Sequence, residues 1–239
     1  MSRFVGFGEG RGAGVRKAFV SLVTVLVLAT IFAFQTGAVS FGSGDGTYTF
    51  IRHQGGDPAT PVTFSSCKPI RVEINLEGVD DRETAQRTII SAMAEVSAAS
   101  GLHLQYVGPT SRRPRWPDHT LTVEGGAWPV LVAFATPAEL PAMEGKAGLG
   151  GGTSIRRGTV ERYVTGTVAV ETDYFNGLAG RHRGFEHGRA TVMHELGHVL
   201  GLGHVDDDGE VMNGNGHGET ELGPGDRKGL ALLGKGPCF

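Results

Sequence analysis

Apolar and polar residues alternate along residues 70–76, and a period of two predicts a half-buried strand. After Asp80, which with Glu83 resembles a capping box, the apolar spacing changes to that of an amphipathic helix. Gly101 offers this helix its C-terminal cap. The pattern therefore predicts a strand followed by a helix whose apolar face packs on the core.

The rest of the chain continues this mixture of elements. Alternating apolar residues over 102–106 predict a second strand. The unbroken apolar run 130–135 predicts a third strand that is more deeply buried, and residues 167–171 are expected to form a fourth. A second helix is expected over roughly 184–200. The glycine-rich stretch 148–152 lacks the lysine and spacing of a phosphate loop, so we interpret it as a flexible turn. This order predicts a single α+β domain.

The N-terminal region carries a targeting signal. Residues 18–34 are 17 consecutive residues without a charge, preceded by Arg16 and Lys17. Their length leaves a cleaved signal peptide and an uncleaved membrane anchor both open, and either would place the following chain outside the cytoplasm. The expected organisation is 1–40 for the signal or anchor, 41–66 for a linker or arm, and 67–239 for the folded domain.

Composition narrows the class of protein. With 39% apolar residues the chain can bury a sizeable core, although its 39 glycines predict many turns. A formal charge of −3 provides no basic footprint for nucleic acid. Cys67 and Cys238 lie near the two ends of the expected domain, so export predicts a disulfide between them, with two separate buried thiols as the alternative.

The second expected helix carries the candidate chemistry. His194 and His198 are four residues apart, so their imidazoles project from one helix face about one turn from each other. Glu195 is offset by about 100° of helix rotation, which places its carboxylate beside a shared metal ion instead of on it. We therefore predict two zinc ligands and a general base. Leu196 belongs to the face that packs on the core.

A third histidine follows the end of the helix. Gly201 can adopt the left-handed conformation that ends helices, which lets the chain turn and bring His204 back as a ligand. Three histidines leave one of zinc's four tetrahedral positions open, and an open position distinguishes a catalytic site from a structural one. Water activation with Glu195 as general base and later general acid is the expected chemistry.

The segment HELGHVLGLGH resembles the long motif of the metzincin zinc peptidases at His194, Glu195, His198, Gly201 and His204. Met212, eight residues after the third histidine, resembles the methionine turn of the matrixin branch, and Asp226 resembles the acidic start of its C-terminal helix. The resemblance implies a mixed sheet, a zinc helix beneath an active-site cleft, and a monomeric endopeptidase that binds an extended peptide by strand addition.

Three further interpretations stay open at this stage. The acidic loop formed by Asp206, Asp207, Asp208 and Glu210 could hold calcium, as matrixin loops do, but a solvated run of charge is favoured. The chain could also be a noncatalytic exported domain that zinc stabilises, although Glu195 speaks against that function. A zinc amidase acting on a nonpeptide amide is disfavoured only by the family resemblance.

Overall fold

The computed structural model describes residues 41–42, 46–116, 127–216 and 218–239. Residues Ala38–Phe239 form one compact unit, and the predicted targeting segment 18–34 lies outside the described residues. Within the part that is described, no helix is both long and apolar enough to cross a membrane.

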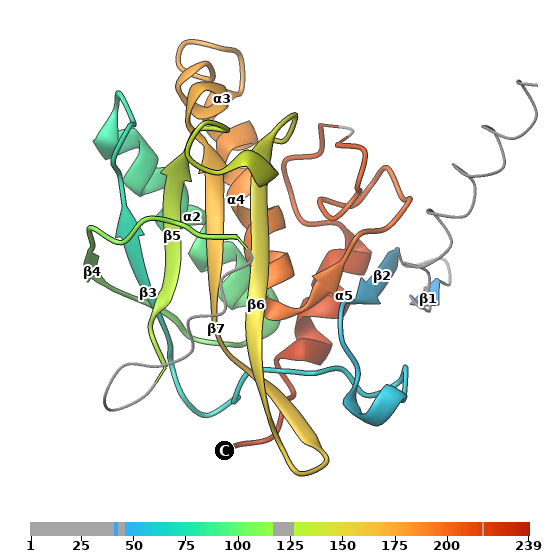
Figure 1. Ribbon diagram of the computed structural model, residues 1–239. Helices are drawn as coiled ribbons and strands as arrows, with labels where there is room; N and C mark the ends of the chain where they lie inside the picture. The colour runs from blue at the N-terminus through green and yellow to red at the C-terminus, as the bar shows by residue number, and fades with distance from the viewer. Residues whose placement is uncertain (1–40, 43–45, 117–126, 217) are drawn as a thin grey trace, which may run out of the picture. The chain divides into compact units, whose positions relative to one another are not determined.

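A five-stranded sheet with the strand order β4-β3-β5-β7-β6 forms the centre of the unit (Figure 1). Its strands are β3 (Ile70–Asn75), β4 (Leu104–Pro109), β5 (Val130–Ala135), β6 (Gly148–Arg157) and β7 (Val160–Glu171). The first four in the order pair in parallel, whereas β6 pairs antiparallel with β7. The expected mixed sheet is therefore present, with β6 as an antiparallel edge strand.

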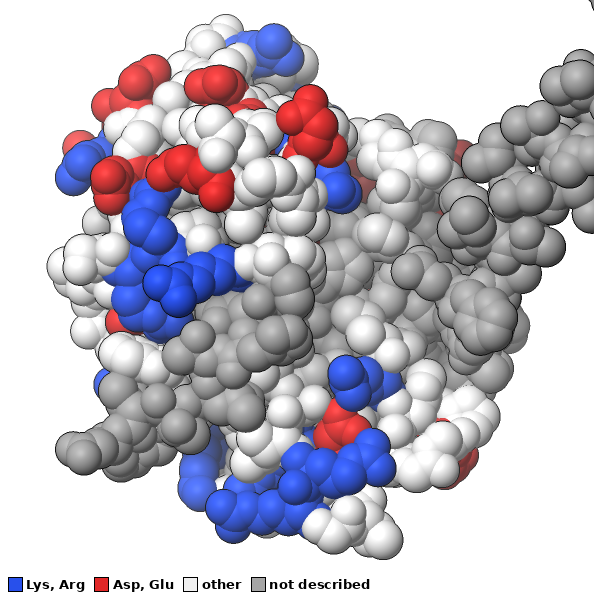
Figure 2. Space-filling view, in the orientation of Figure 1, with Lys and Arg blue, Asp and Glu red and all other residues white. Residues whose placement is uncertain are grey.

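The prediction of a flexible turn at residues 148–152 is wrong, because these residues form the first half of β6. The glycines keep this part of the strand narrow enough for a helix to lie directly on it, since a Cβ atom at Gly150 would collide with the backbone carbonyl of Glu195. Strand β6 continues into a hairpin with β7, and basic side chains gather around the end of this hairpin (Figure 2).

Two long helices lie side by side on one face of the sheet (Figure 1). Helix α2 (Arg82–Ser100) is capped by Asp81, whose side chain accepts a hydrogen bond from Thr84 N, so it starts one residue later than the Asp80–Glu83 pair predicted. Helix α4 (Gly184–Leu200) packs against α2, β6 and β7. The short α3 (Thr172–Asn176) precedes it, and α5 (Pro224–Leu233) packs against α2.

The apolar faces of these elements meet in one core. Each element contributes a side chain that is at most 2% exposed: Ile74 of β3, Ile89 of α2, Leu196 of α4 and Leu230 of α5. Leu196 therefore packs in the core, as the sequence predicted, while its neighbours on α4 turn toward a cleft. Burial of these side chains fixes the rotation of α4 and so the direction of its histidines.

Residues 41–66 differ from the loosely docked arm that their composition suggested. Strand β2 (Thr47–Phe50) pairs with β1 (Phe41–Gly42) on one side and with β8 (Leu202–Gly203) on the other. The side chains of Tyr48, Phe50, Val62 and Phe64 are buried in the main core. These scattered aromatic and apolar residues contribute to the domain, so its core begins before Cys67.

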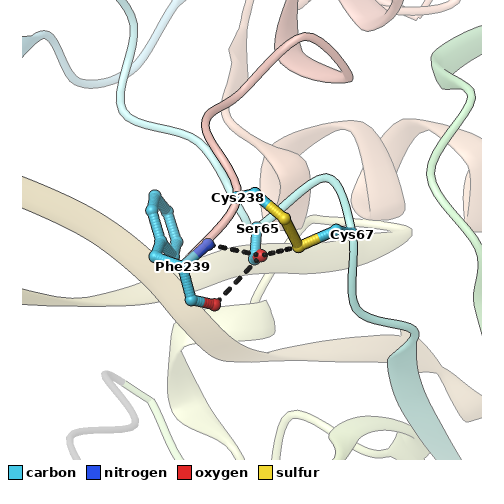
Figure 3. Close-up of a disulfide and its surroundings, with 4 residues drawn as sticks. All are labelled: Ser65, Cys67, Cys238 and Phe239. Atoms are coloured by element: carbon cyan, nitrogen blue, oxygen red, sulfur yellow. Dashed lines mark hydrogen bonds between the residues drawn. A yellow bond between two sulfur atoms is a disulfide. The ribbon is translucent and has the colours of Figure 1, made fainter.

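The predicted disulfide between Cys67 and Cys238 is present and closes a sequence separation of 171 residues (Figure 3). Ser65 lies beside it, where its hydroxyl oxygen accepts a hydrogen bond from Phe239 N at 3.2 Å and lies 3.5 Å from the Cys67 sulfur. The two ends of the domain are therefore joined covalently and by hydrogen bonds at the same place.

Candidate metal centre

Helix α4 holds two imidazoles in fixed orientations. His194 Nδ1 lies 2.7 Å from the carbonyl oxygen of Val211, and His198 Nδ1 lies 2.8 Å from that of Leu202. A carbonyl can only accept, so Nδ1 of each ring carries the proton and donates it. The Nε2 atom of each ring is left as a lone-pair donor for a metal ion, which is the usual outer-shell arrangement of metal-binding histidines.

The chain turns sharply after α4 and brings back the third histidine. Gly201 ends the helix with a φ of 121°, a backbone conformation that favours glycine, and β8 carries the chain to His204. The three Nε2 atoms then lie 3.0, 3.0 and 3.1 Å from one another. Tetrahedral zinc with Zn–N distances near 2.05 Å would separate its ligands by about 3.3 Å, close to this spacing.

The close approach of the Nε2 atoms is not a hydrogen-bonded arrangement. Because His194 and His198 donate through Nδ1, their Nε2 atoms are both acceptors when the rings are neutral, yet they lie 3.1 Å apart. Two facing lone pairs repel unless a cation lies between them. Among the described residues, these three histidines are the one group of potential metal ligands that converges in this way.

Burial keeps the rings in the form that binds metal. It lowers the pKa of His194 to about 4 and that of His198 to about 3, and it also lowers the pKa of the more exposed His204. Neutral imidazoles are therefore expected at pH 7. Three neutral nitrogen donors fit zinc, which commonly takes three histidines at catalytic sites.

Glu195 lies next to this centre and is almost completely buried. The residue is 6% exposed, and its carboxylate makes no hydrogen bond to another described residue. A Cβ atom on Gly148 would lie 2.7 Å from Glu195 Oε1, which shows how closely β6 covers this side chain. Burial raises the pKa of Glu195 to about 8, so the group is ready to exchange a proton near neutral pH.

Met212, which the sequence motif predicted as a methionine turn, is buried against helix α4 between the positions of His194 and His198. It is 2% exposed, and a Cβ atom on Gly197 would lie 2.6 Å from its sulfur. Gly197 is thus the place on α4 where the missing side chain makes room for Met212. Val211, the preceding residue, orients His194 through its carbonyl oxygen.

Asp226 connects the turn at Met212 to helix α5. Its carboxylate accepts hydrogen bonds from Val211 N at 2.6 Å, Met212 N at 3.2 Å and Gly223 N at 3.0 Å. The carboxylate of Glu210 in turn accepts hydrogen bonds from Gly225 N and Asp226 N. Burial raises the pKa of Asp226, although the three backbone donors act in the opposite direction. These two buried carboxylates fix the floor of the centre.

The acidic loop shows no arrangement that would hold calcium. Glu210 is turned toward the backbone of α5, while Asp207 accepts hydrogen bonds from Thr47 Oγ1 and Gly209 N. Asp208 accepts from Asn213 Nδ2. No cluster of carboxylates converges on one point in the described part of this loop. The favoured interpretation, a solvated run of charge, holds for the exposed Asp206 and Asp208, whereas Glu210 is buried.

The three histidines and Glu195 line an open cleft of about 690 Å³. One wall is the glycine-rich start of β6, and the opposite wall is the segment after Met212, including Asn213 and Gly214. Tyr174 and Thr191, whose hydroxyls lie 3.1 Å apart, line the same cleft. The β6 wall was not predicted from the sequence, although Gly148, Gly150 and Gly152 stand at alternate positions, a pattern that signals close helix packing.

No protein-family model matches the sequence, and no curated protein matches it. Among solved structures, the crystal structure of archaemetzincin from Methanopyrus kandleri matches 69% of this chain and 93% of that chain, at 17% identity and a TM-score of 0.39. A TM-score of this size carries no assignment, and the matrixin branch stays a prediction from the sequence motif.

Proposed function

We propose that this protein is a zinc-dependent metalloendopeptidase. The observation that carries the proposal is the convergence of three Nε2 atoms within 3.1 Å of one another, two of them in the metal-binding tautomer, beside the carboxylate of Glu195. The centre opens on a cleft, which suits a catalytic zinc site that retains a position for water or substrate.

His194, His198 and His204 would hold the ion. Bound zinc supplies Lewis acidity, which polarises a substrate carbonyl and makes water acidic at neutral pH. Glu195 accepts the proton of the attacking water and delivers it to the leaving amine. The burial of Glu195 supports its role as the general base, because a poorly solvated carboxylate binds a proton more tightly.

The edge strand supports a peptide as the substrate. Among the described elements β6 pairs only with β7, and its first residues, Gly148 to Gly150, line the cleft, so this free edge can hydrogen-bond an extended chain. A peptide added in this way would pass over the three histidines. A nonpeptide amide would leave most of this edge unused, which disfavours the amidase alternative.

We also propose that the domain works outside the cytoplasm, as a monomer. The Cys67–Cys238 disulfide supports an oxidising compartment, since such bonds are rare in reducing ones. The uncharged segment 18–34 would serve as a signal peptide or as a membrane anchor. N-terminal sequencing of the mature protein distinguishes the two.

The experiment is cleavage of a mixed peptide library by the purified, zinc-loaded chain, read by mass spectrometry. Glu195→Ala should retain zinc, but its peptidase activity should fall by about 10²–10⁴-fold, because the substitution removes the general base. His198→Ala should lose both zinc and activity. Glu83→Ala, at an exposed position in the first turn of α2, is the matched control and should behave as the parent. A zinc-loaded but inert parent would instead favour the noncatalytic binding domain.

A further inference from the structure

Strand β6 runs from the metal centre to a group of arginines. It begins at Gly148, against the Glu195 carboxylate, and ends at Arg157. Six residues separate Gly150 from Arg156, which corresponds to about 20 Å of extended strand. A peptide that follows the free edge of β6 from the centre would therefore reach these arginines after about six of its own residues.

The arginine cluster consists of Arg52 and Arg156. Their side chains are 52% and 60% exposed, and both contact the buried carboxylate of Glu161, at 2.7 and 2.6 Å. Arg157, the next residue, is also exposed, but strand alternation places it on the opposite face of β6. Two positive charges facing one carboxylate leave the cluster with a net positive charge, near the hairpin end where Lys and Arg gather (Figure 2).

The cluster lies on the cleft side of the sheet. Side chains alternate along a strand, so Ser154 and Arg156 share the face of Gly150 and Gly152, and those two glycines lie against α4. The irregularity near Thr153 does not change this alternation, because the extra residue is on β7. From the other wall, Ile51 lines the cleft and is followed directly by Arg52. Arg52 and Arg156, which share Glu161, therefore lie on the face of β6 that the cleft borders.

We infer that the arginine cluster is a substrate subsite that binds an acidic side chain about six residues to the amino-terminal side of the cleaved bond. This inference rests on the proposed peptidase function. The direction follows from pairing: antiparallel addition to β6 is the more stable mode, and a chain antiparallel to β6 runs from the hairpin end toward Glu195. Residues before the cleaved bond then lie toward the arginines.

The expected preference for a substrate with this acidic side chain is modest and sensitive to salt. An ion pair at a solvent-exposed site changes an equilibrium by about twofold to fivefold. Because the screening length falls from about 10 Å at 0.1 M salt to about 3 Å at 1 M, the preference should fade as salt is added. It should appear mainly in KM, because the contact is far from the reacting atoms and acts equally on bound substrate and transition state.

The test compares three peptides built on one neutral sequence that the zinc-loaded full chain cleaves. One carries Gln six residues before the cleaved bond, one carries Glu there, and one carries Glu six residues after the bond. The parent should cleave the second peptide with about twofold to fivefold higher kcat/KM than the other two. Arg156→Gln, which removes the cluster's charge on β6, should abolish this preference, and Arg82→Gln at an exposed position on α2 should keep it.

Arg52→Gln should also reduce the preference, and thermal melting will show whether the loss of a contact with Glu161 disturbs the fold of either variant. Equal kcat/KM for the three peptides in the parent would overturn the subsite, as would an unchanged preference in folded Arg156→Gln. Failure of the parent to cleave even the neutral peptide would instead contradict the peptidase function, and the subsite with it.

Discussion

At the scale of single residues, the burial of Glu195 is the feature with the clearest consequence. A carboxyl group that is 6% exposed and has no hydrogen-bond donor among the described residues resists ionisation. Zinc beside it would reverse part of this effect, because a dication favours the carboxylate anion. The zinc-free protein therefore provides the cleanest measurement of the burial.

We predict that zinc-free parent protein loses stability relative to Glu195→Gln as pH rises. The pKa of Glu195 is about 8 in the folded state and near 4.5 when unperturbed, so between these values the unfolded chain releases a proton that the folded chain retains. The folded state is thus favoured at low pH, and this contribution disappears as pH rises through about 8. The difference should grow by at most about 1.4 kcal/mol per pH unit.

Urea unfolding of both proteins at pH 5 and at pH 8 measures this effect. The titration of the three histidines affects parent and variant alike and so cancels in the comparison. A difference in stability that is the same at both pH values would mean that water reaches the Glu195 carboxylate.

At the scale of elements, the metal centre depends on how α5 is joined to the turn at Met212. The carboxylate of Asp226 satisfies three backbone N–H groups, two of them in the turn, and Glu210 satisfies two at the start of α5. Val211, held by Asp226, is the residue whose carbonyl orients His194. A chain of contacts therefore runs from α5 to the first zinc ligand.

Asp226→Asn should destabilise the protein by about 1–3 kcal/mol, because an amide cannot accept all three hydrogen bonds and leaves a buried donor without a partner. Zinc affinity should fall by about tenfold, since the orientation of His194 is no longer fixed. Chemical unfolding and competition with a chelator provide the two measurements. Asp80→Asn, at an exposed position, is the control, and equal values for both variants would contradict the role of Asp226.

The elements differ in how far the sequence could predict them. Helix α4 and its ligands were predictable because the spacing of His194 and His198, and the glycine before His204, are local features of the chain. Strand β6 was not, because its glycines have low strand propensity and are explained only by the approach of α4 at Gly150. The packing of residues 41–66 likewise depends on partners such as β8 that are distant in the sequence.

At the scale of the whole domain, the Cys67–Cys238 disulfide joins the first core segments to the C-terminal end. The closed loop spans a separation of 171 residues, and restricting so long a loop in the unfolded state is the main source of stabilisation in the chain-entropy model. The disulfide is formed far from the three histidines in sequence, so its effect on stability and its effect on zinc can be measured separately.

Replacing both cysteines with serine should lower the free energy of unfolding by about 2–5 kcal/mol and leave the zinc content of the folded protein unchanged. Denaturant titration and metal analysis of the same preparation measure both quantities. Loss of zinc at a concentration of denaturant where the variant is still folded would show that the disulfide also shapes the metal centre.

In the proposed metallopeptidase, His194, His198 and His204 hold one zinc ion beside Glu195. Diffraction from crystals of the zinc-loaded protein, recorded above and below the zinc absorption edge, tests it most directly. We predict one anomalous peak that lies within about 2.0–2.1 Å of the three Nε2 atoms. The absence of a peak there, or a peak held by other residues while these histidines stay unliganded, would contradict the account.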